Sequence, residues 1–316
     1  AASARNKKIS LLEPKRAQNM SIMLSRFRKY TFEEIRDAVI NVDEKVMNLE
    51  NVTCLKTYCP EPEEAVVCKD YEGDLTLLGQ PELFIRCLSE VPMLKLRLSA
   101  MSVKISFGDK FSAIEVNLEK MKVAVDALSS SETLEKMLKM MLAIGNYING
   151  NTPRGGAFGF KLTSLSKLGD TKCVSNPKET LLHYLIRVCD SHANDVLNIT
   201  DELACVHEAI ESDPEQIQID LKEMNDSMSI VSNILNQVDE SDAIHPYLQS
   251  FFNDNQPKIS SAVDELTSSN DKFKEFLKKY GGGNTKYAEL MSVLHTFLNS
   301  FKRALDGMYG PKSGGG

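Results

Sequence analysis

The chain has 316 residues, of which 42% are hydrophobic and 26% charged, a composition typical of a globular protein with a substantial buried core. No stretch approaches the roughly 18 apolar residues of a membrane span, and the first ten residues lack the apolar run of a secretory signal, so we expect a cytoplasmic protein. The seven cysteines form no Cys-x-x-Cys pair, which favours buried free thiols over a zinc site or a disulfide framework.

The net charge of −7 is unevenly distributed along the chain. Residues 1–36 carry nine Lys or Arg and three Asp or Glu, a balance of +6, which leaves −13 for the remainder. A basic N-terminal part suits an acidic partner. Nucleic acid is disfavoured as that partner, because the chain as a whole is acidic and has no basic stretch interleaved with aromatic residues.

Helical periodicity runs through nearly the whole chain and strand signals are scarce, which predicts an all-α fold. We expect the helices to be interrupted by proline and glycine. The expected breaks are Pro60, Pro62, Pro81, Pro92, Gly108, residues 150–159, Pro177, Pro214, Pro257 and residues 281–283.

The first predicted helix, residues 15–29, has an apolar stripe of Met20, Met23, Leu24 and Phe27. At 100° per residue, Ile22 points roughly 150° away from the centre of that stripe. Its outward neighbours are polar or basic: Lys15, Gln18, Ser25, Arg26 and Lys29. Either a second layer of the same domain covers Ile22, or Ile22 is an interface anchor with a charged rim.

Two further helices are predicted over residues 114–128 and 132–147. The second is apolar on several sides, as expected of a helix buried in a larger helical body. It leads into a glycine-rich segment, residues 145–172, in which glycines permit close approach of a second chain and Asn146 and Asn149 can bond exposed backbone. This segment is not a phosphate-binding loop, because no Lys-Ser/Thr follows its last glycine and no strand precedes it.

Three stretches near the C-terminus keep the alternating four-and-three spacing of long, seam-forming helices. They run from Ile217 to Val238, from Ile259 to Tyr280 and from Leu290 to Met308. Short breaks between them predict an antiparallel, coiled-coil-like bundle. Asn270 occupies a seam position in the second stretch, where it either fixes the register or borders a water-filled gap.

The histidines and paired carboxylates suggest no catalytic chemistry or metal site, since none shows a recognisable ligand spacing. We therefore expect a protein that is not an enzyme and uses no cofactor or metal. Function has to come from binding surfaces.

From Gly145 the sequence reads GNYINGNTPRGGAFGFKLTSLSKLGDTK, and ETLLHYLIRV follows after a short gap. Together with residues 14–22, PKRAQNMSI, these motifs resemble the formin homology 2 domain over roughly residues 9–309. The resemblance implies an elongated, multi-helix all-α fold made of a knob, a post and an antiparallel coiled-coil segment. We place a linker remnant at 1–8, the knob at 9–100, the post at 101–210, the coiled-coil segment at 211–309, and a disordered tail or engineered remnant at 310–316.

The resemblance also implies a function: nucleation of unbranched actin filaments, binding to their barbed ends and processive elongation as a dimer. Ile22 corresponds to the family's knob isoleucine, which enters a cleft on actin, and Lys172 to the lysine of the post. The basic residues Lys15, Arg16, Arg26 and Lys29 suit the acidic surface of actin. Other implied partners are profilin–actin, through a proline-rich segment upstream of the domain, and a second copy of the chain, all within the actin cytoskeleton.

In the family, the post of one subunit receives a tryptophan-bearing lasso from the other. The residues expected to receive it are Gly145, Asn146, Tyr147, Asn149, Gly156, Gly159 and Phe160. The chain has no tryptophan, and the lasso is expected to be mostly or wholly missing. Two alternatives stay open at this stage, a monomeric core that binds or caps actin without nucleating and a helical scaffold unrelated to actin.

Overall fold

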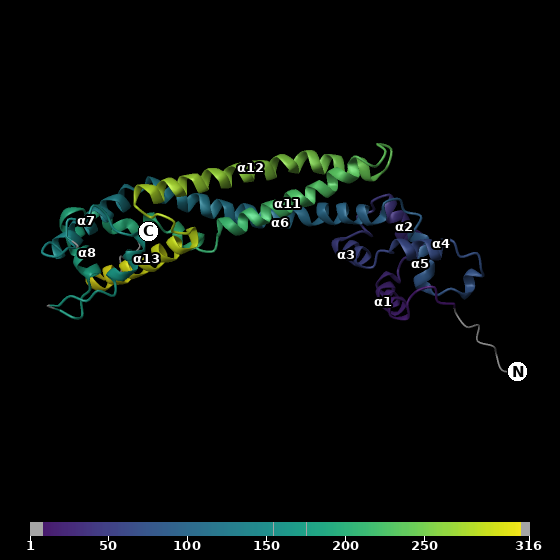
Figure 1. The fold of residues 1–316 in the computed structure, drawn as a ribbon, viewed down its shortest axis with the longest axis horizontal. Coiled ribbons are helices and arrows are strands. Elements are labelled where there is room, and N and C mark those ends of the chain that lie inside the picture. The colour runs from purple at the N-terminus through teal and green to yellow at the C-terminus, as the bar shows by residue number, and fades with distance from the viewer. Residues whose placement is uncertain (1–8, 154, 175, 311–316) are drawn as a thin grey trace. The chain divides into compact units, whose positions relative to one another are not determined.

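The computed structural model describes residues 9–153, 155–174 and 176–310, and within these ranges the chain is built from thirteen α-helices and four short 3-10 helices. Figure 1 labels the main helices. The expectation of an all-α fold is confirmed. None of the described helices is both long and apolar enough to cross a membrane.

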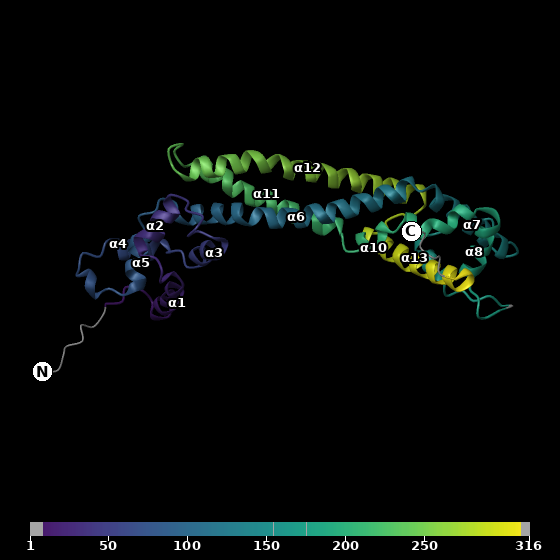
Figure 2. The ribbon, with the colours of Figure 1, turned by 180° about the vertical axis from the view of Figure 1, so that it is seen from behind.

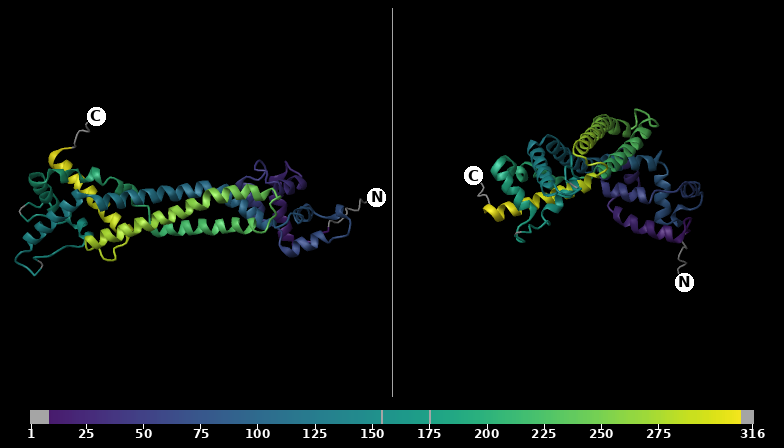
Figure 3. Two further views of the ribbon diagram at one scale, coloured as in Figure 1. Left: turned by 90° about the horizontal axis from the view of Figure 1, so that it is seen from above. Right: turned by 60° about the vertical axis from the view of Figure 1, so that its left-hand side comes forward.

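The chain divides into two compact units, one formed by residues up to Phe111 with Lys222–Ile259, the other by Ser112–Leu221 with residues from Ser260 onward. Three long helices contribute to both: α6 (Leu94–Ser130), α11 (Pro214–Leu235) and α12 (Ile244–Lys279). Within each unit their segments lie side by side in all views (Figures 1, 2 and 3). The subdomain boundaries expected at residues 100 and 210 remain predictions.

The first unit begins with five short helices. They are α1 (Pro14–Leu24), α2 (Phe32–Ile40), α3 (Leu49–Thr57), α4 (Pro62–Lys69) and α5 (Gln80–Leu88), with 3-10 turns η1 (Ser25–Phe27) and η2 (Leu75–Leu77). Helices α1, α2 and α4 all pack on α5, which buries Phe84, Ile85 and Leu88. Sequence signals set the helix starts, because proline occupies the first turn of α1 and Thr31 forms a capping box at α2.

A buried ion pair joins α6 to the segment before α12 in the first unit. The Arg97 guanidinium is 1% exposed, pairs with both carboxylate oxygens of Asp242, and donates from Nε to the carbonyl of Pro92 at 2.9 Å. Such a bidentate pair fixes the direction in which α6 leaves the turn at Pro92.

The second unit contains the glycine-rich segment. It comprises α7 (Glu132–Ile148), η3 (Leu162–Leu168), α8 (Leu181–His192), η4 (Asn194–Asn198), α9 (Ile199–Glu202), α10 (Cys205–Ala209) and α13 (Tyr287–Tyr309). Helix α13 packs on η3, α8, α9 and α10, and it buries Leu290, Leu294, Phe297 and Phe301. The sequence predicts that this helix bundles with α12. In the structure its principal neighbours come from residues 162–209 instead, because an apolar stripe does not specify which helix covers it.

Two of the expected helix breaks are wrong, since Gly108 lies inside α6 and Pro257 inside α12. Both residues are exposed, so neither interrupts the packing of side chains in the buried core. The buried residues Phe251 and Ile259 flank Pro257 and keep α12 packed across the missing backbone N–H.

Asn270 is half-buried and borders a cavity of about 650 Å³ with Phe273 and Tyr287. This supports the explanation that Asn270 borders a gap, over the explanation that it fixes the register.

Candidate functional site

Helix α1 presents one face to the core and Ile22 to the outside. The predicted stripe is confirmed, as Met20, Met23, Leu24 and Phe27 are all buried. Ile22 is 65% exposed, so the interpretation that a second layer of the chain covers it is wrong for the described residues. An exposed branched side chain on a well-anchored helix has the geometry of an interface anchor.

The four basic residues expected around Ile22 are not equivalent. Lys15 and Lys29 are exposed, and no ion pair with another described residue holds them. Arg16 is half-buried, pairs with Glu64 at 2.9 Å and donates to the carbonyl of Cys59 at 3.0 Å. Its guanidinium is therefore committed to fastening α1 to the start of α4, a role that its place in the sequence did not reveal.

Arg26 also has internal partners. It pairs with Glu50 and donates from Nε to Oδ1 of Asn51 at 3.1 Å, both on α3. The hydrogen bond with Glu50 raises the pKa of Arg26. The charge of Arg26 is thus largely balanced within the chain, and the freely available positive charge near Ile22 comes from the lysines.

The glycine-rich segment is fastened to the end of α7 by the side chain of Asn146. Its Nδ2 donates to the carbonyl of Ala157 at 2.8 Å, and its Oδ1 accepts from the N–H of Ala157 at 2.7 Å. Close packing at the base of the loop requires glycine, because a Cβ at Gly155 would lie 2.6 Å from the carbonyl oxygen of Asn149. Gly156 has φ +69°, the left-handed region that glycine favours.

The end of α7 and the loop that follows it display apolar side chains to solvent. Tyr147 is 83% exposed and Phe158 is fully exposed, while Ile148 is more than half exposed. A cavity of about 410 Å³ lies between α7, the loop, η3 and α8. Among the predicted lasso-receiving residues, those that line it are Gly145, Asn146, Asn149, Gly159 and Phe160; Tyr147 and Gly156 do not.

Lys172 forms an isolated antiparallel β-bridge with Thr180, just before α8. The N–H of Cys173 donates to the carbonyl of Glu179 at 2.9 Å, and the N–H of Leu181 donates to the carbonyl of Thr171 at 2.8 Å. Arg187 hydrogen-bonds to Glu179 and lowers the pKa of its carboxyl. These bonds hold the backbone of Lys172 in place while its side chain remains exposed.

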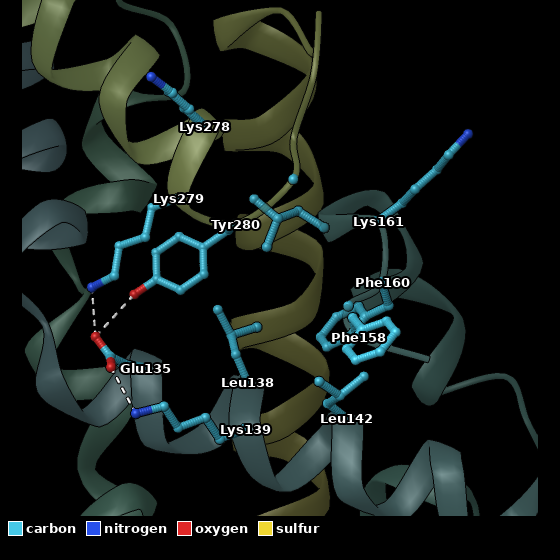
Figure 4. A pocket seen from close by; sticks show the side chains of 13 residues that line it. Glu135, Leu138, Lys139, Leu142, Phe158, Phe160, Lys161, Lys278, Lys279 and Tyr280 are labelled. Carbon is cyan, nitrogen blue, oxygen red and sulfur yellow. Dashed lines mark hydrogen bonds and ion pairs between the residues drawn. The ribbon is translucent and has the colours of Figure 1, made fainter. Parts of the chain in front are cut away.

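A second cavity, of about 760 Å³, adjoins the first and shares Leu142, Gly159 and Phe160 with it. Figure 4 shows its side chains, which come from α7, the glycine-rich loop and the end of α12. Glu135 accepts from Lys139 at 2.8 Å and from Lys279 at 2.5 Å. The two hydrogen bonds lower the pKa of Glu135 to about 2, so this carboxyl stays ionised.

The structure also joins two histidines that appeared unrelated in the sequence. His207 on α10 and His295 on α13 share a hydrogen bond between their Nδ1 atoms at 2.7 Å, with the rings nearly perpendicular. Nε2 of His295 lies 3.0 Å from Nδ2 of Asn299. Burial, His295 and Lys302 together lower the pKa of His207. No group of three His, Cys, Asp or Glu side chains within the described ranges could hold a metal ion.

Comparison with known proteins assigns the chain to a family. The family model described as Formin Homology 2 Domain matches residues 1–302. The chain is 30% identical over 310 residues to rat Protein diaphanous homolog 3, covering 95% of this chain and 26% of that protein. It is also 30% identical over 311 residues to human Disheveled-associated activator of morphogenesis 2, covering 96% of this chain and 29% of that protein.

Formin-like protein 20 of Arabidopsis thaliana is similarly related, at 30% identity over 318 residues, 96% of this chain and 19% of that protein. The chain thus spans less than a third of the length of each of these relatives. The family match covers both compact units, including α1 with Ile22 and the glycine-rich segment. The chain therefore belongs to the formin homology 2 domain family.

Proposed function

We propose that this chain binds actin at filament barbed ends, nucleates unbranched filaments and promotes their elongation as a dimer. The observation that carries the proposal is the exposure of Ile22, 65%, on a helix whose other large apolar side chains are buried. A partner with a complementary apolar cleft would bury this side chain, and Lys15 and Lys29 would supply an attractive rim for an acidic surface.

Lys172 is proposed as a second actin contact, in the other compact unit. Its ammonium group is exposed, and the hydrogen bonds Thr171–Leu181 and Cys173–Glu179 fix the backbone on either side of it. A positioned lysine adds orientation and electrostatic attraction, although each exposed pair contributes only about 0.2–1 kcal/mol. Ile22 is therefore the main anchor in this proposal. Binding alone would do the work, with no catalytic group.

The dimer would form through the cavity beside Asn146. It has apolar walls from Met141, Leu142 and Phe160, and the exposed Tyr147 and Phe158 stand close to it in sequence. An exposed apolar surface around a pocket is typical of a protein interaction site. The proposed occupant is a segment of a second copy or of the longer protein, as the resemblance implies.

The proposal is tested by following fluorescent actin assembly from monomers with and without the chain, alongside the mass of the chain by light scattering. Faster assembly in the presence of a dimer would support nucleation. A monomer that slows growth at barbed ends would instead indicate a capping core. Absence of any effect on assembly, together with no sedimentation with filaments, would contradict the actin proposal.

A further inference from the structure

The turn that follows α7 contains a threonine directly before a proline, Thr152–Pro153. The chain has 11 prolines, and Pro153 alone among them follows a serine or threonine. Both residues are exposed. Proline-directed protein kinases recognise this dipeptide, because their substrate groove takes a residue without a backbone N–H directly after the acceptor hydroxyl. The turn therefore offers one chemically defined acceptor on an accessible loop.

The sequence around this turn carries positive charge only. Between Glu135 and Asp170 there is no Asp or Glu, whereas five Lys or Arg occur there. A phosphate on threonine adds a charge of about −1.5 to −2 at pH 7. Phosphorylation of Thr152 would therefore introduce the first negative charge into this segment.

The hydroxyl of Thr152 closes the turn onto the end of α7. Its Oγ1 donates to the carbonyl oxygen of Asn149 at 2.9 Å, and the N–H of Thr152 donates to the same oxygen at 2.8 Å. Asn149 is the C-cap of α7, so this carbonyl lies at the negative end of the helix dipole. The N–H of Gly155 in turn donates to the carbonyl of Thr152 at 3.0 Å. Thr152 thus connects the end of α7 to Gly155.

A phosphate on Thr152 would be incompatible with this arrangement. The ester has no O–H at Oγ1, so the donor to the Asn149 carbonyl is lost. The phosphate oxygens are also repelled by that carbonyl and by the negative end of α7. Asn149 lines the cavity beside Asn146. Opening of the turn would therefore disturb one wall of that cavity.

We propose that Thr152 is a phosphorylation site for a proline-directed protein kinase, and that its phosphate opens the turn and weakens binding of a second chain at the cavity beside Asn146. The kinase transfers the γ-phosphoryl group of ATP. A bond forms between Oγ1 and phosphorus, the bond from that phosphorus to the bridging oxygen breaks, ADP leaves, and the hydroxyl proton passes to the kinase's catalytic carboxylate. Only the effect on the dimer rests on the proposed function.

The acceptor is tested by incubating the full chain with ATP and a purified cyclin-dependent kinase and measuring its intact mass. The unmodified chain should gain one phosphoryl group. Thr152→Ala lacks the acceptor and Pro153→Ala lacks the recognition element, so neither should gain one. Thr171→Ala, which removes another exposed threonine hydroxyl, is the matched control and should be modified like the unmodified chain. No gain in the unmodified chain, or an equal gain in Thr152→Ala or Pro153→Ala, would overturn the site.

The effect of the phosphate is measured by hydrogen exchange at the Gly155 amide. The phosphorylated chain should exchange this amide about tenfold faster or more. Thr152→Val loses the hydroxyl's hydrogen bond without adding charge, and its rate should be intermediate. Unchanged exchange in the phosphorylated chain would overturn the effect on the turn.

Light scattering over a range of concentrations measures the effect on the dimer. Phosphorylation should raise the dissociation constant of a dimeric chain about tenfold or more. An unchanged dissociation constant would overturn the regulatory part of the inference. A monomeric unmodified chain would contradict the proposed dimer instead, and the mass and exchange measurements would still decide on the site and the turn.

Discussion

The side-chain amide of Asn146 forms two hydrogen bonds with the backbone of Ala157, at 2.8 and 2.7 Å, and so closes the glycine-rich loop onto the end of α7. An amide is the side chain that can both donate to a carbonyl and accept from an N–H at one peptide unit. The walls of the cavity beside it, including Gly159 and Phe160, depend on where this loop lies.

Asn146→Ala should therefore loosen the loop without unfolding the unit. A neutral hydrogen bond contributes about 0.5–1.5 kcal/mol, so loss of two bonds should speed hydrogen exchange at the Ala157 amide by about tenfold or more. Asn146→Asp keeps the acceptor for the Ala157 N–H but loses the donor, and its exchange rate should be intermediate. An unchanged rate of hydrogen exchange at the Ala157 amide in Asn146→Ala would contradict the proposal that Asn146 holds the loop in place.

Ile22 and Met20 lie two positions apart on α1 and should respond oppositely to truncation. Ile22→Ala removes an exposed side chain and should change the free energy of unfolding by no more than about 0.5 kcal/mol. Met20→Ala removes a fully buried side chain and should destabilise the chain by about 2–5 kcal/mol. Urea denaturation followed by circular dichroism measures both. Similar losses in the two variants would show that Ile22 is packed within the chain.

Lys172→Asp should weaken binding to actin filament ends about threefold to tenfold at low salt, because one attractive exposed contact becomes repulsive. The effect should shrink as salt is raised, since exposed charges are screened. The control is Lys178→Asp, which changes another exposed lysine in the same region. Equal effects of the two substitutions would mean that overall charge, rather than the position of Lys172, matters.

Arg97 and Asp242 should contribute strongly to the stability of the first unit. Asp242→Ala leaves a guanidinium that is 1% exposed without its carboxylate partner and should cost about 3–5 kcal/mol. A double variant, Arg97→Met with Asp242→Leu, should recover much of this loss because no buried charge remains unpaired. A double variant less stable than Asp242→Ala would contradict this explanation.

The pair of His207 and His295 predicts a pH dependence of stability. The pKa of His207 is lowered in the folded chain, so the unfolded chain binds the proton more readily. The contribution of His207 is therefore fully present above its usual pKa of about 6.5 and is lost as the pH falls toward the lowered value. The melting temperature should decrease between pH 7 and pH 5, and His207→Gln should reduce that decrease. An identical dependence of melting temperature on pH in His207→Gln would contradict the assignment of this effect to His207.

Periodicity was sufficient to predict several helices and the outward position of Ile22, because these depend on residues within two turns of one another. The glycine-rich loop was also predictable, since Gly155 and Gly156 occupy backbone positions that other residues fit poorly. The side-chain partners were not predictable. Arg16 and Glu64 are 48 positions apart, and His207 and His295 are 88 positions apart, so only the folded packing brings them together.

Pro257 illustrates a different limit of local rules. Proline inside a helix loses one backbone hydrogen bond, which predicts a break, but the buried neighbours Phe251 and Ile259 keep α12 continuous. The packing of α13 on η3 and α8 was missed for a related reason, as its apolar stripe is equally compatible with a helical bundle. In both cases tertiary contacts decide between structures that the local sequence leaves open.

The central claim, that Ile22 is the anchor for actin, is tested most directly by fluorescent actin assembly with three proteins: the unmodified chain, Ile22→Ala and Ile219→Ala. Ile219 on α11 is 52% exposed, so its truncation removes a comparable side chain from a different surface. We predict that the unmodified chain and Ile219→Ala accelerate assembly equally and that Ile22→Ala has lost the activity while remaining folded. Full activity in a folded Ile22→Ala variant would contradict the claim.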